Sequence, residues 1–185
     1  MILTLVDRRT GADGASREFH GEQWARLERL ALGLGRANWT VAVVLVDDEA
    51  IADLNLRFRS KAGVTDVLSF SYLESGGSGT PDLGGDQNYA ATNLWAPADP
   101  SGAPESVVGE LVLAPEFVAV RCVANDWPIS DEVPMLVVHG CLHLLGWDHE
   151  EVSEGRLMQD CEMKILAAEG LSHPLRQRSG ADDAR

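Results

Sequence analysis

The sequence has few cysteines, few basic residues and no long apolar run, and each shortage argues against a class of protein. Its 185 residues include 3 cysteines, an odd number without a C-x-x-C pair, which suits a reducing, cytoplasmic setting better than a disulfide framework. No apolar run approaches the roughly 18 residues that span a bilayer, so we expect no membrane partner. The start, MILTLVDRRTGADG, lacks a basic leader and predicts a first strand instead of a signal peptide.

Basic residues are outnumbered, because 15 Lys and Arg stand against 29 Asp and Glu, a formal net charge of −14. This excess argues against a nucleic-acid partner, since the overall field slows the encounter with phosphates. The distribution of charge along the chain weakens this argument, because residues 1–72 are nearly neutral, with 9 basic residues and 10 acidic ones. The one dense basic cluster near the middle of the chain is RFRSK at 57–61. It is either a phosphate-binding patch or the solvated end of a helix.

Hydrophobic periodicity predicts four strands and five helices. The strands are rich in β-branched residues or alternate in polarity, and they lie at 2–7, 39–46, 66–72 and 108–114. The helices carry apolar residues at helical spacing, and they lie at 18–35, 48–59, 115–126, 130–146 and 150–170. This order predicts an α+β fold, in which a small mixed sheet of about four strands is covered by helices.

The stretch between the third and fourth strands, residues 74–106, is rich in Gly, Pro, Ser and Asp and shows no periodicity. Such composition predicts a flexible loop inserted into the domain. It does not mark a domain boundary, because the strands on either side look like parts of one sheet. We therefore expect a single domain over residues 1–171 and a frayed tail over residues 172–185.

Three of the 5 histidines fall within VVHGCLHLLGWDH, residues 137–149. On a helix, His139 and His143 lie one turn apart on the same face, and Gly146 lets the chain reverse so that His149 returns as a third ligand. Imidazole is a common zinc ligand, and catalytic zinc sites use three protein ligands. We therefore predict one zinc ion per chain, held by this helix and the turn after it. The plain alternative is that the three histidines are unrelated.

The residues around this cluster are expected to have structural roles. Ser130 is predicted to cap the histidine helix, with Pro134 tolerated in its first turn. Cys141 lies between two of the histidines but points away from their face, so we expect a small buried side chain there. The two remaining histidines, His20 and His173, are predicted to be ordinary surface residues.

Gly140 distinguishes this motif from that of the zinc metalloproteases, which share the spacing H-x-x-x-H-x-x-G-x-x-H. In those enzymes a glutamate follows the first histidine and acts as the general base. Glycine cannot take a proton, whereas RNA cleavage needs charge on phosphate oxygens to be stabilised, which a metal and an arginine can do. The pattern favours phosphodiester chemistry. It leaves the base open among metal hydroxide, Asp148, Glu150 and the RNA 2′-hydroxyl, and Asp148 is also a candidate fourth ligand or a partner of His149.

Three blocks of the sequence resemble the YbeY-type endoribonucleases, the ribosomal-RNA maturation RNases. HGCLHLLGWDH (139–149) is similar to that family's signature H-G-x-L-H-L-x-G-x-D-H. LNLRFRSKAGVTDVLSF (54–70) resembles its N-x-x-[FY]-R…T-[DN]-V-L-S-F segment, and GELVL (109–113) resembles its G-D-[IL]-x-[IL] strand. The resemblance covers most of the chain, from Val41 to about Leu171. The departures are the long loop at 74–106, Val64 in place of a common proline, and Glu110 in place of the usual aspartate.

This resemblance implies a zinc-dependent, single-strand-specific endoribonuclease that acts in maturation of the 3′ end of 16S ribosomal RNA and in ribosome quality control. It also implies an important arginine, which corresponds to Arg59, and partners in the small ribosomal subunit or its associated factors. Two other functions compete with it. One is a metalloprotease-like hydrolase, against which Gly140 argues. The other is a non-catalytic module in which zinc only stabilises the fold and the RFRSK cluster contacts the ribosome.

Overall fold

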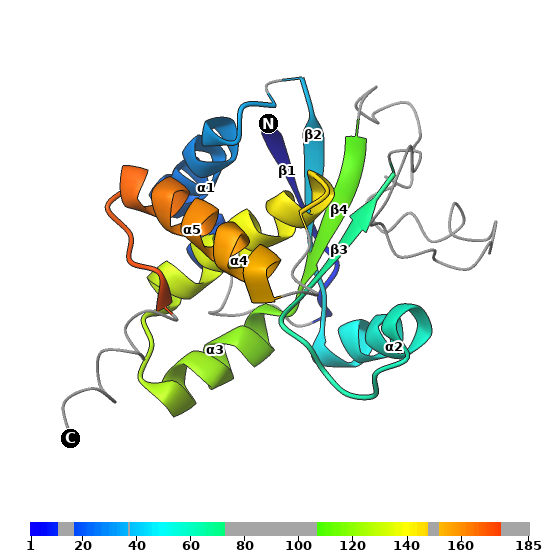
Figure 1. Cartoon of the computed structure of the whole chain (residues 1–185). Coiled ribbons are helices and arrows are strands. Elements are labelled where there is room, and N and C mark those ends of the chain that lie inside the picture. The colour runs from blue at the N-terminus through cyan, green and yellow to red at the C-terminus, as the bar shows by residue number, and fades with distance from the viewer. Residues whose placement is uncertain (11–16, 37, 73–106, 148–151, 175–185) are drawn as a thin grey trace.

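The computed structural model describes residues 1–10, 17–36, 38–72, 107–147 and 152–174. Its elements, shown in Figure 1, are β1 (Ile2–Asp7), a short 3-10 turn η1 (Arg17–Phe19), α1 (Gly21–Gly33), β2 (Thr40–Leu45), α2 (Asp48–Arg59), β3 (Val67–Ser71), β4 (Val107–Leu113), α3 (Pro115–Asn125), α4 (Ile129–Leu144) and α5 (Val152–Ala168). The predicted loop at 74–106 lies outside the described residues, as does the predicted tail from residue 175 onward.

The described strands form one mixed sheet in the order β1-β2-β4-β3. β1, β2 and β4 run parallel, while β3 pairs with β4 in the antiparallel sense. The register sets Val43 of β2 beside Leu5 of β1 and Leu111 of β4. Every residue of β2 is buried, as expected for an apolar strand inside a parallel sheet with both faces covered. The predicted α+β class with a small mixed sheet is confirmed.

Alternate residues of β2 face two different hydrophobic clusters, because successive side chains of a strand point to opposite faces. Val41 and Val43 belong to the larger cluster, which α1, α4 and α5 cover, whereas Ala42 and Val44 belong to a smaller cluster covered by α2. Figure 1 shows this layering, with α1, α4 and α5 gathered together and α2 set apart from them. The helix that carries the histidines and the helix that carries Arg59 therefore lie on opposite faces of the sheet.

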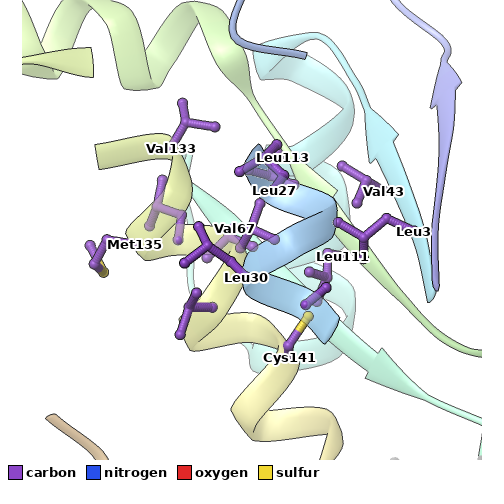
Figure 2. Close-up of a cluster of buried hydrophobic side chains, with 14 of the residues drawn as sticks. Leu3, Leu27, Leu30, Val43, Val67, Leu111, Leu113, Val133, Met135 and Cys141 are labelled. Atoms are coloured by element: carbon purple, nitrogen blue, oxygen red, sulfur yellow. The ribbon is translucent and has the colours of Figure 1, made fainter. Parts of the chain in front are cut away.

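The larger cluster fixes the position of α4. Figure 2 shows Cys141 of α4 among side chains that include Leu30 of α1 and Leu111 of β4. The Cys141 side chain is fully buried, and burial raises the pKa of its thiol to about 12. Its predicted role as a small buried side chain is confirmed, because a thiol with so high a pKa stays protonated and unreactive.

The start of α4 differs from the prediction. The helix begins at Ile129 with Pro128 as the N-cap residue, and the Pro128 carbonyl accepts the backbone N–H groups of Asp131 and Glu132 at 3.0 and 3.2 Å. Ser130 therefore lies inside the helix and does not cap it. Pro134 lies beyond the first turn, inside the helix, where it cannot donate to the carbonyl four residues earlier. A proline that fixes an extended backbone directly before the helix starts it earlier than a serine cap would.

The segment after α5 also differs from the prediction. Residues 172–174 belong to the predicted frayed tail, but His173 is only 5% exposed and Pro174 is buried. The prediction of His173 as an ordinary surface residue is therefore wrong, whereas His20 is exposed as predicted. The cause is a chain reversal after α5, where Gly170 takes a left-handed conformation with φ of 71° and the Leu171 N–H donates to the Leu166 carbonyl at 3.1 Å. Among the described residues, no helix is long and apolar enough to cross a membrane.

Candidate metal centre

α4 presents His139 and His143 on one face, as their spacing predicts. Their ring centroids are 4.6 Å apart with an interplanar angle of 87°, and their Nε2 atoms are 3.2 Å apart. Both residues are partly exposed, although most of their neighbours in α4 are buried. Two imidazole nitrogens from one helix therefore converge on one point at the protein surface.

Each imidazole is held through its Nδ1 atom. His143 Nδ1 lies 2.9 Å from the carbonyl oxygen of Trp147, and a carbonyl only accepts, so we assign the ring hydrogen to Nδ1. The turn after α4 makes this contact, because Gly146 adopts a left-handed φ of 86° and the Trp147 N–H donates to the Leu142 carbonyl at 3.1 Å. His139 Nδ1 lies 2.7 Å from Oε1 of Glu162 on α5 and donates to that carboxylate.

This pattern of hydrogen bonds fits a metal ion. With hydrogen on both Nδ1 atoms, the lone pairs of the two Nε2 atoms face each other across 3.2 Å, an arrangement that a shared cation stabilises. Two nitrogens bound at the usual zinc distance of about 2.0–2.1 Å with tetrahedral angles would lie about 3.3–3.4 Å apart. The observed separation is close to that value. The chain's own residues therefore fit two ligands of a zinc ion.

Glu162 is the residue of this centre that sequence analysis missed. Burial favours the protonated acid, but the hydrogen bonds from His139 and His173 outweigh it and lower the pKa of Glu162 to about 2. Its two oxygens accept from the two rings, at 2.7 Å from His139 and 2.8 Å from His173. The sequence does carry a signal, because Glu162 lies four residues from Met158 and from Leu166 in the buried stripe of α5. Glutamate is rarely buried at such a position unless it is paired.

The third predicted ligand, His149, lies outside the described residues, as do Asp148 and Glu150. Within the described part of the chain, no group of three His, Cys, Asp or Glu side chains is arranged to hold a metal. That part supplies His139 and His143, and the completion of the site by His149 stays a prediction.

The structure gives a physical reason for Gly140. A Cβ atom at this position would lie 2.6 Å from Cδ2 of Leu111 and 3.0 Å from Oγ of Ser69, so α4 approaches β3 and β4 too closely for any other residue without a shift. Position 140 faces the sheet, between two histidines that face outward. A glutamate there would meet the buried Leu111 side chain, which argues further against a protease-type base.

Arg59 does not join the histidines among the described contacts. It is the exposed last residue of α2, where Ser60 ends the helix in a left-handed conformation with φ of 55°. Strand β3, at one end of the described sheet, separates the two regions. Phe58 of α2 packs edge-on against Phe70 of β3, with ring centroids 5.3 Å apart, whereas Ser69, the preceding residue of β3, lies against Gly140 of α4.

Arg121 connects the start of β3 to the start of α4. Its guanidinium pairs with Asp66, just before β3, and with the buried Glu132 in the first turn of α4, and it lies over the Trp127 ring at 5.8 Å. Burial raises the pKa of Asp66, but the Arg121 hydrogen bond and charge outweigh burial and lower it. This ion network fixes the edge strand relative to the histidine helix, which sequence analysis did not foresee.

Comparison with known proteins identifies relatives over most of the chain. The model of the family described as Endoribonuclease YbeY matches residues 20–170. A protein of Symbiobacterium thermophilum named Endoribonuclease YbeY is 40% identical over 147 residues, 79% of this chain and 81% of that protein. Proteins of the same name from Salinispora tropica and Dinoroseobacter shibae are each 38% identical, over 69% and 78% of this chain and over 73% and 74% of their own lengths. The family match includes both described histidines and Arg59.

Proposed function

We infer that this chain is an endoribonuclease, because it belongs to the endoribonuclease YbeY family. The observation that carries the inference is the family match over residues 20–170, and the similarity is 38–40% identity to three proteins of that name. Within the histidine motif, His139 and His143 lie on the outward-facing side of α4. The resemblance also extends further toward the N-terminus than the Val41 boundary expected from the motifs.

We propose that the enzyme is metal-dependent and holds one zinc ion per chain through His139, His143 and His149. The support is the pair of Nε2 atoms 3.2 Å apart and the hydrogen bonds that direct both of them to one point. When bound, zinc supplies Lewis-acid stabilisation of the charge that develops on phosphate oxygens during cleavage. The carboxylate of Glu162 and the carbonyl of Trp147 keep the two rings oriented, and Gly140 lets α4 rest directly on the sheet.

We propose Arg59 as the residue that binds the scissile region of RNA from the opposite side of β3. Arginine presents a planar fork of donors that matches phosphate and keeps its charge at any working pH. An exposed helix end suits this role, because the backbone of a bound RNA strand can reach it directly. A strand that contacts both Arg59 and the histidines would cross the edge strand β3.

The substrate that we propose is single-stranded ribosomal RNA, cleaved during maturation of the 3′ end of 16S RNA and in ribosome quality control, in the cytoplasm. The small ribosomal subunit or its associated factors would be the partners. The support is the family membership together with the RFRSK cluster, in which the basic residues Arg57, Arg59 and Lys61 are exposed.

The test is incubation of the purified full chain with a single-stranded RNA oligonucleotide and, in parallel, with casein, each with added zinc and with a chelator. We expect chelator-sensitive cleavage of the RNA and intact casein. Cleavage of casein would favour a metalloprotease. Intact RNA with zinc-loaded protein would favour the non-catalytic module that contacts the ribosome.

A further inference from the structure

The chain beyond α5 folds back onto the metal centre. Gly170, with its φ of 71°, reverses the chain, and three residues later the His173 side chain is 1% exposed. Its Nε2 atom lies 2.8 Å from Oε2 of Glu162, 11 residues earlier in the chain. A polar ring so fully buried needs a polar partner. The His173 ring is hydrogen-bonded to the same carboxylate that holds His139.

Each carboxylate oxygen of Glu162 is hydrogen-bonded to a different histidine. Oε1 accepts the Nδ1 hydrogen of His139 at 2.7 Å and Oε2 lies 2.8 Å from His173 Nε2. A carboxylate oxygen accepts hydrogen bonds, so we assign a hydrogen to His173 Nε2, which donates it to Oε2 of Glu162. One carboxylate with a donor at each oxygen has its plane fixed from both sides. A carboxylate with one donor could rotate about its last side-chain bond.

We propose that His173 is a positioning residue of the metal centre, which holds Glu162 so that its carboxylate fixes the orientation and tautomer of His139. The proposal rests on the metal site proposed above. In this arrangement the segment that follows α5 is part of the centre, although it contributes no ligand. Carboxylates that accept from the second ring nitrogen of a metal-binding histidine typically change metal affinity by 10–100-fold when removed, and His173 acts one step further out.

A merely structural role for His173 predicts a different result. If the ring only fills space beside α5, an apolar residue of similar size would preserve the centre. If its donated hydrogen bond matters, only a donor at the same place would. His173→Leu keeps the volume without the donor, and His173→Gln carries an amide N–H at about the reach of Nε2. His20, which is exposed, offers a matched control in His20→Gln.

The first experiment measures zinc affinity by competition with a chromophoric chelator, on full-length variants whose melting temperatures are recorded. We expect His173→Leu to bind zinc on the order of 10-fold more weakly than the unmodified chain, and His173→Gln and His20→Gln to stay near it. Equal affinity in the Leu and Gln variants would overturn the proposal, even if His173→Leu melted at a lower temperature.

The second experiment needs no metal and separates this proposal from the proposed zinc site. Nitrogen-15 spectra of the metal-free protein, at a pH where imidazole is neutral, report the tautomer of the His139 ring. We expect a single Nδ1–H tautomer in the unmodified chain and in His173→Gln, and a mixture of tautomers in His173→Leu. A chain that shows this pattern but binds no zinc would refute the zinc site and leave the positioning intact. An unchanged His139 spectrum in His173→Leu would refute the positioning, whatever the zinc affinity.

Discussion

At the C-terminal end of α4 each histidine ring is hydrogen-bonded through Nδ1 to a second group, whereas at the C-terminal end of α2 Arg59 is exposed beside a left-handed residue. The histidine side is backed by the larger hydrophobic cluster and by a buried carboxylate 5% exposed in its side chain. α2 rests on the smaller cluster on the other face of the sheet. Both regions end a helix, but they differ in how far their functional side chains are fixed in advance.

If the proposed function is right, the difference follows from what each region binds. A metal ion requires nitrogens at set distances and angles, so the folded chain must already hold the two rings in the right orientation. A phosphate group on a flexible RNA chain can be bound by a long side chain that moves with it. We therefore expect substitutions at the histidine end to act on metal content and stability, and substitutions at Arg59 to act on cleavage alone. Each of the following predictions tests that division.

The largest effect is expected from His143→Ala. Loss of one ligand of three, together with its hydrogen bond to the Trp147 carbonyl, should reduce bound zinc from about one per chain to near zero and abolish RNA cleavage. Metal analysis of the dialysed variant measures the first effect and a gel-based cleavage assay the second. The exposed His20→Ala is the control and should retain both. A His143→Ala protein with full metal content would mean that the ion, if present, is bound elsewhere.

The next effect is expected from Arg59→Ala, which should keep its zinc and its fold but lose cleavage on the order of 10²–10³-fold. Arg59→Lys should recover little, because a point charge does not reproduce the guanidinium fork. Arg57→Ala, in the same basic cluster, is the matched control. It should weaken RNA binding in a salt-dependent manner and leave turnover at saturating RNA unchanged. Normal turnover in zinc-loaded Arg59→Ala would remove Arg59 from the mechanism.

A moderate effect on stability is expected from Gly140→Ala. The added Cβ would lie 2.6 Å from Leu111 Cδ2, so α4 must shift or the core must repack, at a cost of about 1–3 kcal/mol in the free energy of unfolding. Gly33→Ala in α1 is the control, since a Cβ there meets no atom within 4 Å, and it should be neutral or stabilising. Urea denaturation measures both. If the two variants had equal stability, close packing of α4 on the sheet would not be what requires glycine.

Local patterns in the sequence were enough to predict the strands and the shared face of His139 and His143 on α4. The spacing of His139 and His143 sets their relation within one helix, and the glycine at 146 ends that helix as expected, with a left-handed φ of 86°. The partners of these residues were not predictable in the same way. Glu162 and His173 reach the centre only because α5 packs on α4 and the chain then reverses at Gly170, and no pattern within one element specifies either contact.

The relation between Arg59 and the histidines depends on topology in the same way. The strand order β1-β2-β4-β3 puts β3 at one end of the described sheet, after a chain segment that the sequence presents only as a loop. Residues on opposite faces of β3, Phe70 and Ser69, then contact α2 and α4 respectively. The sequence motifs show that Arg59 and the histidines belong to one family pattern, but the strand order decides which face each occupies.

The smallest effect is expected from Asp66→Asn, which tests the ion network that links the two regions. It should be present near neutral pH and disappear in acid. Arg121 holds the pKa of Asp66 below its ordinary value of 3.8, so the folded chain binds this proton less readily than the unfolded chain. The charge of Asp66 therefore contributes stability that is complete above pH 3.8 and is lost as the pH falls through the lower, folded pKa. Asparagine keeps the shape and lacks the charge, and carboxyl groups that do not contact Arg121 cancel in the difference between the two proteins. The difference in free energy of unfolding between the unmodified chain and Asp66→Asn should thus be constant near neutral pH and shrink in acid.

A difference that stayed constant through the acid range would show that the ionised form of Asp66 is not what Arg121 stabilises. It would also mean that the edge strand between Arg59 and the histidines is held by packing instead of by charge.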